Sequence, residues 1–228
     1  MGAGAPTPPD SPFGPYLRIE ADGSVIVANA FQEMGQGVHA GLAAIVAEEL
    51  DADWDRVRVE TPRANAALYG MQATAGSNTT ASSWEKMRKV GAAARAMLVQ
   101  AASVQWGVPA SSLRVADGVV SHAASGRSAG FGELVQAAGA IEPPQDPVLK
   151  SPDQFTLIGT QRVRRLDSRD KSTGKTVYTQ DIQLPNMVVA MVAHSPRFGG
   201  KLKRWDDRDA RRVPGVIDVF AIPSGVAV

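Results

Sequence analysis

The chain has 228 residues, 44% of them hydrophobic and 21% charged, which is an ordinary globular composition for one large or two smaller domains. Its net charge of +1, from 24 basic and 23 acidic residues, gives no reason to expect nucleic acid or an anionic membrane as a partner. The sequence has no cysteine for a disulfide or an iron–sulfur cluster, no metal-ligand spacing among His39, His122 and His194, and no apolar run of membrane-spanning length.

Residues 1–15 are rich in alanine, glycine and proline and predict an extended leader. They contain neither a basic region nor an apolar core, so we expect no signal peptide in this stretch. Tyr16 to Val27 then predicts a β-hairpin, because two alternating apolar runs flank the turn pair Asp22-Gly23. Arg56–Glu60 also alternates and predicts a strand.

Between these strands lies the tripeptide Gly35-Gln36-Gly37, called the glycine corner below, followed by an apolar helical pattern from Val38 to Leu50. A helix N-terminus offers free N–H groups and the positive end of the helix dipole, so the first hypothesis is a phosphate or anionic cofactor at this corner. The alternative is that the glycines serve only the turn. Glu33, just before the corner, is expected to bond nearby backbone and not to act as a catalytic base.

A long polar loop over 61–83 leads into a predicted helix from Trp84 to about Trp106. Its end, Gly76 to Ser83, brings hydroxyl and amide donors to a second helix N-terminus, which suits a phosphate or a pterin-like heterocycle. The alternative is a solvated loop in which Thr80 or a nearby serine caps the helix.

The remaining pattern predicts an α+β protein. We expect a hairpin over Leu113–His122, a helix over Phe131–Ala138 with Ser128 as a candidate cap, and a proline-rich linker near 142–153 that marks a domain boundary. Strands are expected at 177–179, 187–193 and 216–222, with a polar helix over 205–212. The apolar run that ends at Val228 is expected to need further partners. Thr173-Gly174-Lys175-Thr176 lacks the upstream glycine and the following helix of a phosphate loop.

Three groups of segments carry a resemblance to a known family. In chain order they are Glu33-Met34-Gly35-Gln36-Gly37-Val38-His39 with Glu48-Glu49-Leu50; Ala75-Gly76-Ser77-Asn78-Thr79-Thr80 before the Trp84 helix; and Thr173–Tyr178, Asp181–Met187, His194-Ser195-Pro196 and Val213–Val216. From about Tyr16 onward, the sequence resembles the N-terminal portion of the molybdenum-binding large subunit of the xanthine oxidase family. It is most similar to the isoquinoline 1-oxidoreductase β-subunit and aldehyde dehydrogenase large-subunit type.

With the leader at 1–15 and a linker at 146–160 expected from composition, the resemblance implies part of the molybdopterin-binding domain at 16–145 and an incomplete a/b hammerhead domain at 161–228. It further implies that the chain contacts molybdopterin cytosine dinucleotide with molybdenum, a cofactor shared with another chain. Gly76 is expected nearest the metal. The cofactor-binding residues carried over from the family are Gly35, Gln36, Gly37, Ala75, Gly76, Ser77, Asn78, Thr79 and Thr80.

The family's catalytic glutamate lies in a Gly-Glu segment that has no counterpart in this sequence, so we expect no catalytic residue and no metal ligand in this chain. The resemblance therefore implies part of an enzyme that oxidises an aldehyde or an N-heteroaromatic compound with oxygen from water, inactive alone. The alternatives are a cofactor-free assembly module that retains the fold, and generic nucleotide binding at the glycine corner.

Expected partners are the rest of the large subunit with the catalytic glutamate, a small subunit with 2Fe–2S clusters, and a cytochrome c subunit as a further candidate. The expected location is the periplasm or a periplasm-facing membrane complex, with the cytoplasm as the alternative.

Overall fold

The computed structural model describes residues 11–228, which divide into two compact units that meet between Gly174 and Lys175. Residues 1–10 of the expected leader lie outside the described residues. Residues 11–15 form turns, and Phe13 is buried in the hydrophobic core, so this part of the leader is packed and not extended. An aromatic side chain that finds an apolar surface holds the backbone around it in place.

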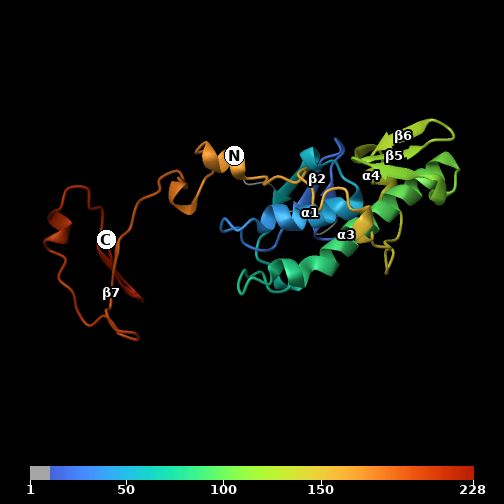
Figure 1. Ribbon diagram of the computed structural model, residues 1–228. Helices are drawn as coiled ribbons and strands as arrows, with labels where there is room; N and C mark the ends of the chain where they lie inside the picture. The colour runs from blue at the N-terminus through green and yellow to red at the C-terminus, as the bar shows by residue number, and fades with distance from the viewer. Residues whose placement is uncertain (1–10) are drawn as a thin grey trace. The chain divides into compact units, whose positions relative to one another are not determined.

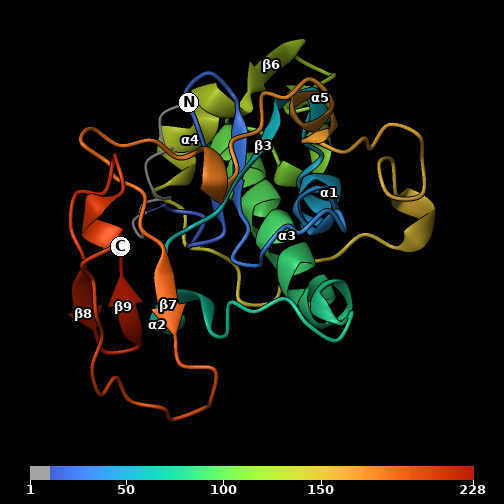
Figure 2. The same ribbon diagram turned by 90° about the vertical axis from the view of Figure 1, so that its left-hand side faces the viewer.

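The first sheet has the order β1-β2-β3. β1 (Leu17–Ile19) and β2 (Val25–Ala28) pair antiparallel, which confirms the predicted hairpin. β3 (Val57–Glu60) pairs parallel to β2, and α1 (Val38–Leu50) makes the crossover between them (Figure 2). Because the chain runs directly from β2 into α1, the glycine corner lies beyond the carboxyl end of a parallel strand. Such ends are where ligands bind in sheets of this kind.

α3 (Thr79–Trp106) packs alongside α1 (Figure 1). The crossing requires Gly91, since a Cβ there would lie 2.4 Å from the Val46 carbonyl oxygen. The prediction for the start of this helix was wrong: it begins at Thr79 and not at Trp84, so Thr80 lies in its first turn and is not the cap. Thr79 and Ser83 are buried, and this packing outweighs the small intrinsic helix penalty of threonine and serine.

Two further helices and a second sheet complete the first unit. α2 (Ala66–Tyr69) is a single turn within the predicted loop, held by an edge-to-face contact between Tyr69 and Tyr16 with ring centroids 5.3 Å apart. β4 (Arg114–Ala116), β5 (Val119–His122) and β6 (Arg127–Gly130) form an antiparallel sheet that leads into α4 (Phe131–Ala138), as predicted for the hairpin and the helix. Ser128 lies in β6 and does not cap α4, whose N-cap is Gly130.

The segment predicted as a linker, 146–160, is bound to the acidic end of α1. The Lys150 ammonium lies 2.8 Å from Glu48 Oε1 and 2.6 Å from Asp51 Oδ1. The Glu48 carboxylate, fully buried, also accepts backbone N–H groups from 156–158 at 2.7 to 3.0 Å. The compact first unit therefore extends through this segment to Gly174, and the assignment of residues 161–228 to a hammerhead domain stays a prediction.

The second unit, 175–228, contains one small sheet with the order β7-β9-β8. Its strands are β7 (Val192–His194), β8 (Phe220–Ile222) and β9 (Gly225–Ala227). The expected strands at 187–193 and 216–222 are therefore present only in part. Residues 177–179 form no strand, and the expected polar helix is only a 3₁₀ turn, Ala210–Arg212.

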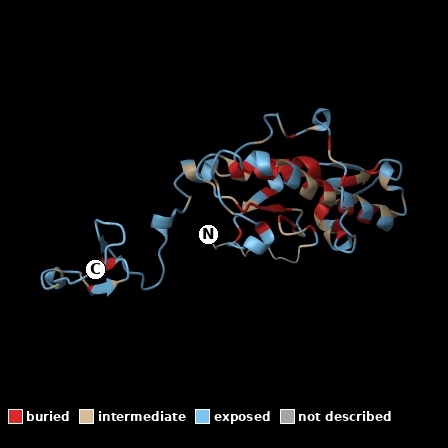
Figure 3. Cartoon of the chain, turned by 90° about the horizontal axis from the view of Figure 1, so that it is seen from below, coloured by how far each residue is buried: buried red, intermediate tan, exposed pale blue. Residues whose placement is uncertain are grey.

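Most of the large apolar residues of this unit are exposed, and Figure 3 colours most of the unit as exposed. The most exposed are Phe198, Val189, Ile217 and Met191. Short strands without a covering second layer are only marginally stable, so apolar alternation alone does not extend them. Within residues 11–228, no helix has both the length and the apolar character needed to cross a membrane.

Candidate functional site

A cleft of about 440 Å³ lies between the glycine corner and the loop that precedes α3. Seven of the nine residues predicted to bind the cofactor line it, namely Gln36, Gly37, Ala75, Gly76, Ser77, Thr79 and Thr80. Gly35 and Asn78 are not among the lining residues, whereas Met34, Val38 and Thr74 are, and sequence reasoning did not select these three. The fold thus brings together two segments that are about forty residues apart in the sequence.

The two walls of the cleft are joined at Gln32 and Thr74. The backbone N–H of Gln32 donates to Thr74 Oγ1 at 3.0 Å, and the same hydroxyl donates to the Gln32 carbonyl at 3.1 Å. The Gln36 amide is also engaged, since its nitrogen donates to the Gln32 carbonyl at 2.9 Å and its oxygen accepts from the Met34 N–H at 2.6 Å. The Gln36 side chain therefore stabilises the conformation of its own loop.

The N-terminus of α1 is already occupied by the carboxylate of Glu33. Its Oε1 accepts N–H groups from Gly35 at 2.8 Å and Gly37 at 2.9 Å, and its Oε2 accepts from His39 at 3.0 Å. Burial tends to raise the pKa of this carboxyl, but the three N–H donors outweigh it and hold the pKa below its usual range. The expectation that Glu33 bonds nearby backbone is confirmed, and the corner has no vacant anion site at these donors.

Burial also lowers the pKa of His39, the second residue of α1, although the Glu33 carboxylate acts in the opposite direction. His39 falls within the helix predicted from Val38 to Leu50, and the structure confirms that position.

The N-terminus of α3 is different. Its N-cap residue, Asn78, makes no capping hydrogen bond through its side chain. The first N–H groups of any α-helix have no acceptor within the helix, and here Thr79 and Thr80 of that first turn line the cleft. Before them, Ser77 and Gly76 both have left-handed backbone conformations, with φ of 55° and 65°. Both helix N-termini thus border the cleft, but the Glu33 carboxylate already accepts N–H groups at α1, whereas the Asn78 side chain accepts none at α3.

The lining of this cleft has the chemistry expected of a phosphate or heterocycle site. It contains hydroxyl, amide and backbone donors together with small residues, and none of its lining side chains is acidic. A Cβ at Gly76 would meet nothing within 4 Å, so the absence of a side chain leaves open space there. Among residues 11–228, no group of three or more His, Asp or Glu side chains is arranged to hold a metal ion. The residues present therefore fit a cofactor held through its phosphate and ring atoms.

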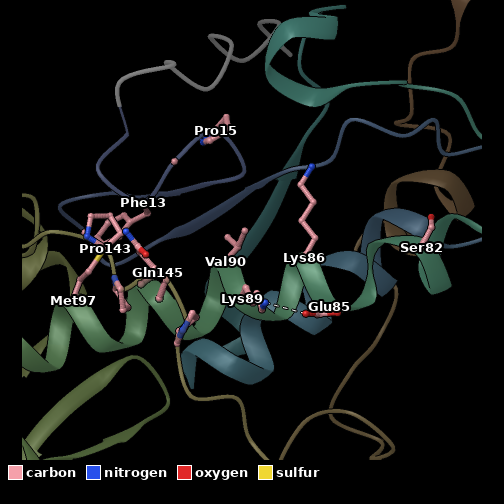
Figure 4. A pocket seen from close by; sticks show the side chains of 15 residues that line it. Phe13, Pro15, Ser82, Glu85, Lys86, Lys89, Val90, Met97, Pro143 and Gln145 are labelled. Carbon is pink, nitrogen blue, oxygen red and sulfur yellow. Dashed lines mark ion pairs between the residues drawn. The ribbon is translucent and has the colours of Figure 1, made fainter.

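Two other cavities lie away from the predicted residues. The larger of these two, about 650 Å³, runs along α3 and is mostly apolar, with several prolines in its wall (Figure 4). At its rim, Glu85 and Lys89 form an ion pair of 2.9 Å. A smaller one, about 310 Å³, is lined by Arg162, Arg164 and Arg165, and of these Arg162 and Arg165 make ion pairs within the chain.

Comparisons with known proteins show the family to which the chain belongs. The sequence model of a family described as "Molybdopterin cofactor-binding domain" matches residues 3–189. The chain is 38% identical to the beta subunit of isoquinoline 1-oxidoreductase from Brevundimonas diminuta, over 93% of this chain and 32% of that protein. It is 33% identical to a nicotinate dehydrogenase subunit from Pseudomonas putida (98% and 19%), and 30% identical to membrane-bound aldehyde dehydrogenase [pyrroloquinoline-quinone] of Gluconacetobacter polyoxogenes (94% and 28%).

Among solved structures, quinoline 2-oxidoreductase from Pseudomonas putida 86 matches with 23% identity and a TM-score of 0.43, over 53% of this chain and 15% of that chain. This likeness is too low to add to the assignment.

The matched family model places the chain among molybdopterin cofactor-binding domains. The chain belongs to the molybdopterin cofactor-binding domain family, within the molybdenum-binding large subunits of the xanthine oxidase family. It spans about a third or less of the length of the curated relatives it matches.

Proposed function

We propose that this chain forms one wall of the molybdopterin site in a multi-chain molybdenum hydroxylase. The observation that supports this most is the single cleft formed by both predicted segments, in a chain whose family match covers the same residues. The relatives carry names of enzymes that act on isoquinoline, nicotinate and aldehyde, so the proposed substrate is an aldehyde or an N-heteroaromatic compound.

The proposed cofactor is the cytosine dinucleotide form of molybdopterin with molybdenum. When bound, it supplies the redox centre at which water-derived oxygen is transferred to the substrate. The backbone N–H groups at the start of α3 and the hydroxyls of Ser77, Thr79 and Thr80 would hold a phosphate or pterin oxygen. Gly76 would leave space beside the metal, and the glycine corner would pack on the cofactor through Gln36 and Gly37.

The catalytic glutamate is proposed to lie on another polypeptide, so that this chain is inactive alone. Glu33 is a poor candidate for that role, because its carboxylate already accepts three backbone N–H groups and its pKa is lowered. A general base must be free to take a proton from the reacting group.

The exposed apolar side chains of residues 175–228 support the rest of the large subunit as a partner. An exposed apolar surface of this kind is typical of a surface that another polypeptide covers. A small subunit with 2Fe–2S clusters is the proposed electron acceptor, followed by a cytochrome c subunit. The proposed location remains the periplasm or a membrane complex facing it.

The test is to produce the chain with its partner polypeptides, purify the complex, and measure molybdenum and cytidine nucleotide per complex. We expect both in near-stoichiometric amounts. The Gly76→Leu variant should lose most of the bound molybdenum, since its side chain would enter the cleft. The matched control is Gly107→Leu, at the other end of α3, which has the same φ of 65° and also open space around it.

The control separates backbone strain from occlusion of the cleft. It should cost a similar amount of stability, about 1–2 kcal/mol for a left-handed position, without loss of molybdenum. A correctly assembled complex that lacks both molybdenum and cytidine would refute the proposal and favour the cofactor-free assembly module.

A further inference from the structure

We infer that Glu33 and Arg165 are a positioning pair that fixes the glycine corner, and with it one wall of the cofactor cleft. This inference rests on the proposed function, because it takes this wall of the cleft to contact the cofactor. Neither residue lines the cleft. Arg165 lies 132 residues beyond Glu33 in the sequence, in the segment that follows the predicted linker.

Glu33, the first member of the pair, restrains the glycine corner by accepting hydrogen bonds from its backbone. Both corner glycines have left-handed backbone conformations, with φ of 103° at Gly35 and 93° at Gly37. A Cβ at Gly35 would meet nothing within 4 Å, so there is open space beside the turn at this position. Glycine in such a position is conformationally free unless hydrogen bonds restrain it. The Glu33 carboxylate provides that restraint by accepting the N–H groups of both glycines and of His39.

The second half of the pair holds the corner from outside. One guanidinium nitrogen of Arg165 donates to the Gly35 carbonyl at 2.6 Å, and another lies 3.4 Å from Glu33 Oε1. Arg165 thus binds both the backbone of the corner and the carboxylate that caps it. Charge-assisted bonds of this kind are about twice as strong as neutral ones and fix a direction as well as a distance.

Arg165 is in turn held by Asp167, which accepts from its Nε at 3.0 Å and from a terminal nitrogen at 2.9 Å. The hydrogen bond from Arg165 holds the pKa of Asp167 far below its usual range, so the aspartate remains charged. Lys171 also pairs with Asp167, and both belong to the same compact unit as the corner. The guanidinium is therefore oriented before any ligand binds.

The pair has a clear consequence for the cleft. Gln36, Gly37 and Val38 line it and are attached to the restrained backbone. Arg165 also offsets the negative charge of Glu33, which lies beside a cleft proposed to bind phosphate. A loss of either member should leave α1 and α3 folded and release only residues 33–39.

The experiment compares wild type with Arg165→Ala, Arg165→Lys and Glu33→Gln in the full complex, using two measurements. The first is amide hydrogen exchange of peptides covering 33–39, and the second is molybdenum per complex. The matched controls are Arg164→Ala, at the exposed neighbouring arginine, and Glu85→Gln, an exposed carboxylate of α3.

We expect about tenfold faster exchange at 33–39 and a severalfold loss of molybdenum in Arg165→Ala and Glu33→Gln. Arg165→Lys should recover part of both, since lysine keeps the charge but not the fork of donors. The controls should match wild type. Unchanged protection of peptides from α1 and α3 shows that the variants remain folded. If Arg165→Ala does not fold, Arg165→Lys and Glu33→Gln test the inference in its place.

Two results would overturn the inference while leaving the proposed function intact. One is a molybdenum-loaded wild type whose variants exchange at 33–39 no faster than wild type does. The other is faster exchange at the corner with no change in metal, which would show that the pair holds the turn but not the site. If wild type itself contains no molybdenum, the proposed function fails, and the assignment of the pair to a cofactor wall fails with it.

Discussion

Lys150→Met is the substitution with the sharpest expected effect on stability. The Lys150 side chain is 6% exposed, and its ammonium contacts two carboxylates, Glu48 of α1 at 2.8 Å and Asp51, the C-cap of that helix, at 2.6 Å. Methionine replaces the aliphatic part of lysine but removes the charge. Removing one partner of a buried ion pair costs about 3–5 kcal/mol, because the remaining charge is left without compensation.

The structure places the expected loss at the lower end of that range. Glu48 keeps its backbone N–H donors from 156–158, and Asp51 keeps an ion pair with Arg95 at 3.1 Å. We therefore expect about 3 kcal/mol, which corresponds to a fall in Tm of about 6–12 °C for a folded unit of this size. Urea and thermal unfolding measure it, and hydrogen exchange should show faster opening at 148–158.

The matched control is Lys89→Met. Lys89 also contacts two carboxylates, Glu85 at 2.9 Å and Asp146 at 3.6 Å, but its side chain is 40% exposed. Exposed pairs contribute about 0–1 kcal/mol, so the control should lose little stability. Equal losses in the two variants would show that burial of the Lys150 cluster does not decide its contribution, and the reasoning would be refuted.

Two further predictions concern α1 and α3, through Glu48 of α1 and through Gly91 of α3, where the two helices touch. Burial raises the pKa of Glu48, but Lys150 and the N–H donors of 156–158 outweigh it, so the folded pKa lies below the unfolded value of about 4.3. The stability that the Glu48 carboxylate contributes is therefore present above that pH and is lost as the pH falls through the folded pKa. In Glu48→Gln, the free energy of unfolding should fall less steeply on the acid side. An unchanged slope would contradict this prediction. Gly91→Ala should destabilise by several kcal/mol, because its Cβ would lie 2.4 Å from a main-chain oxygen of α1, whereas Gly41→Ala, with open space around it, should stabilise by about 0.5–1 kcal/mol; similar unfolding midpoints for the two variants would rule this out.

Local pattern predicted much of the first unit. The hairpin turn at Asp22-Gly23, the helix after the corner and the helix at Phe131–Ala138 all depend on residues close in sequence. The packing of 146–160 could not be predicted in this way, since Lys150 and Glu48 are 102 residues apart. Its proline-rich composition indicates a linker, but a buried ion pair and a fully buried carboxylate anchor it to α1.

In the second unit, local pattern predicted strands that are longer than those in the structure. Its apolar runs predicted strands at 187–193 and 216–222, yet only short parts of each pair in a sheet. Side chains such as Val189 and Ile217 remain exposed, so the burial that would favour extended pairing is missing within residues 175–228. The strand preference of a sequence reflects packing against neighbours, and here the described residues do not provide them.

The location of the proposed anion site depends on which of two helix N-termini is available to an external anion. Both follow glycine-containing loops, and the sequence favoured the corner before α1 as the first hypothesis. The deciding residue is Glu33, four positions before Gly37, which is close enough for one carboxylate to accept N–H groups on both sides of the corner. Asn78 makes no equivalent bond at α3. An acidic residue shortly before a glycine corner is thus a sequence signal that the helix N-terminus is satisfied within the chain, and it directs the search for the anion site to the next uncapped helix.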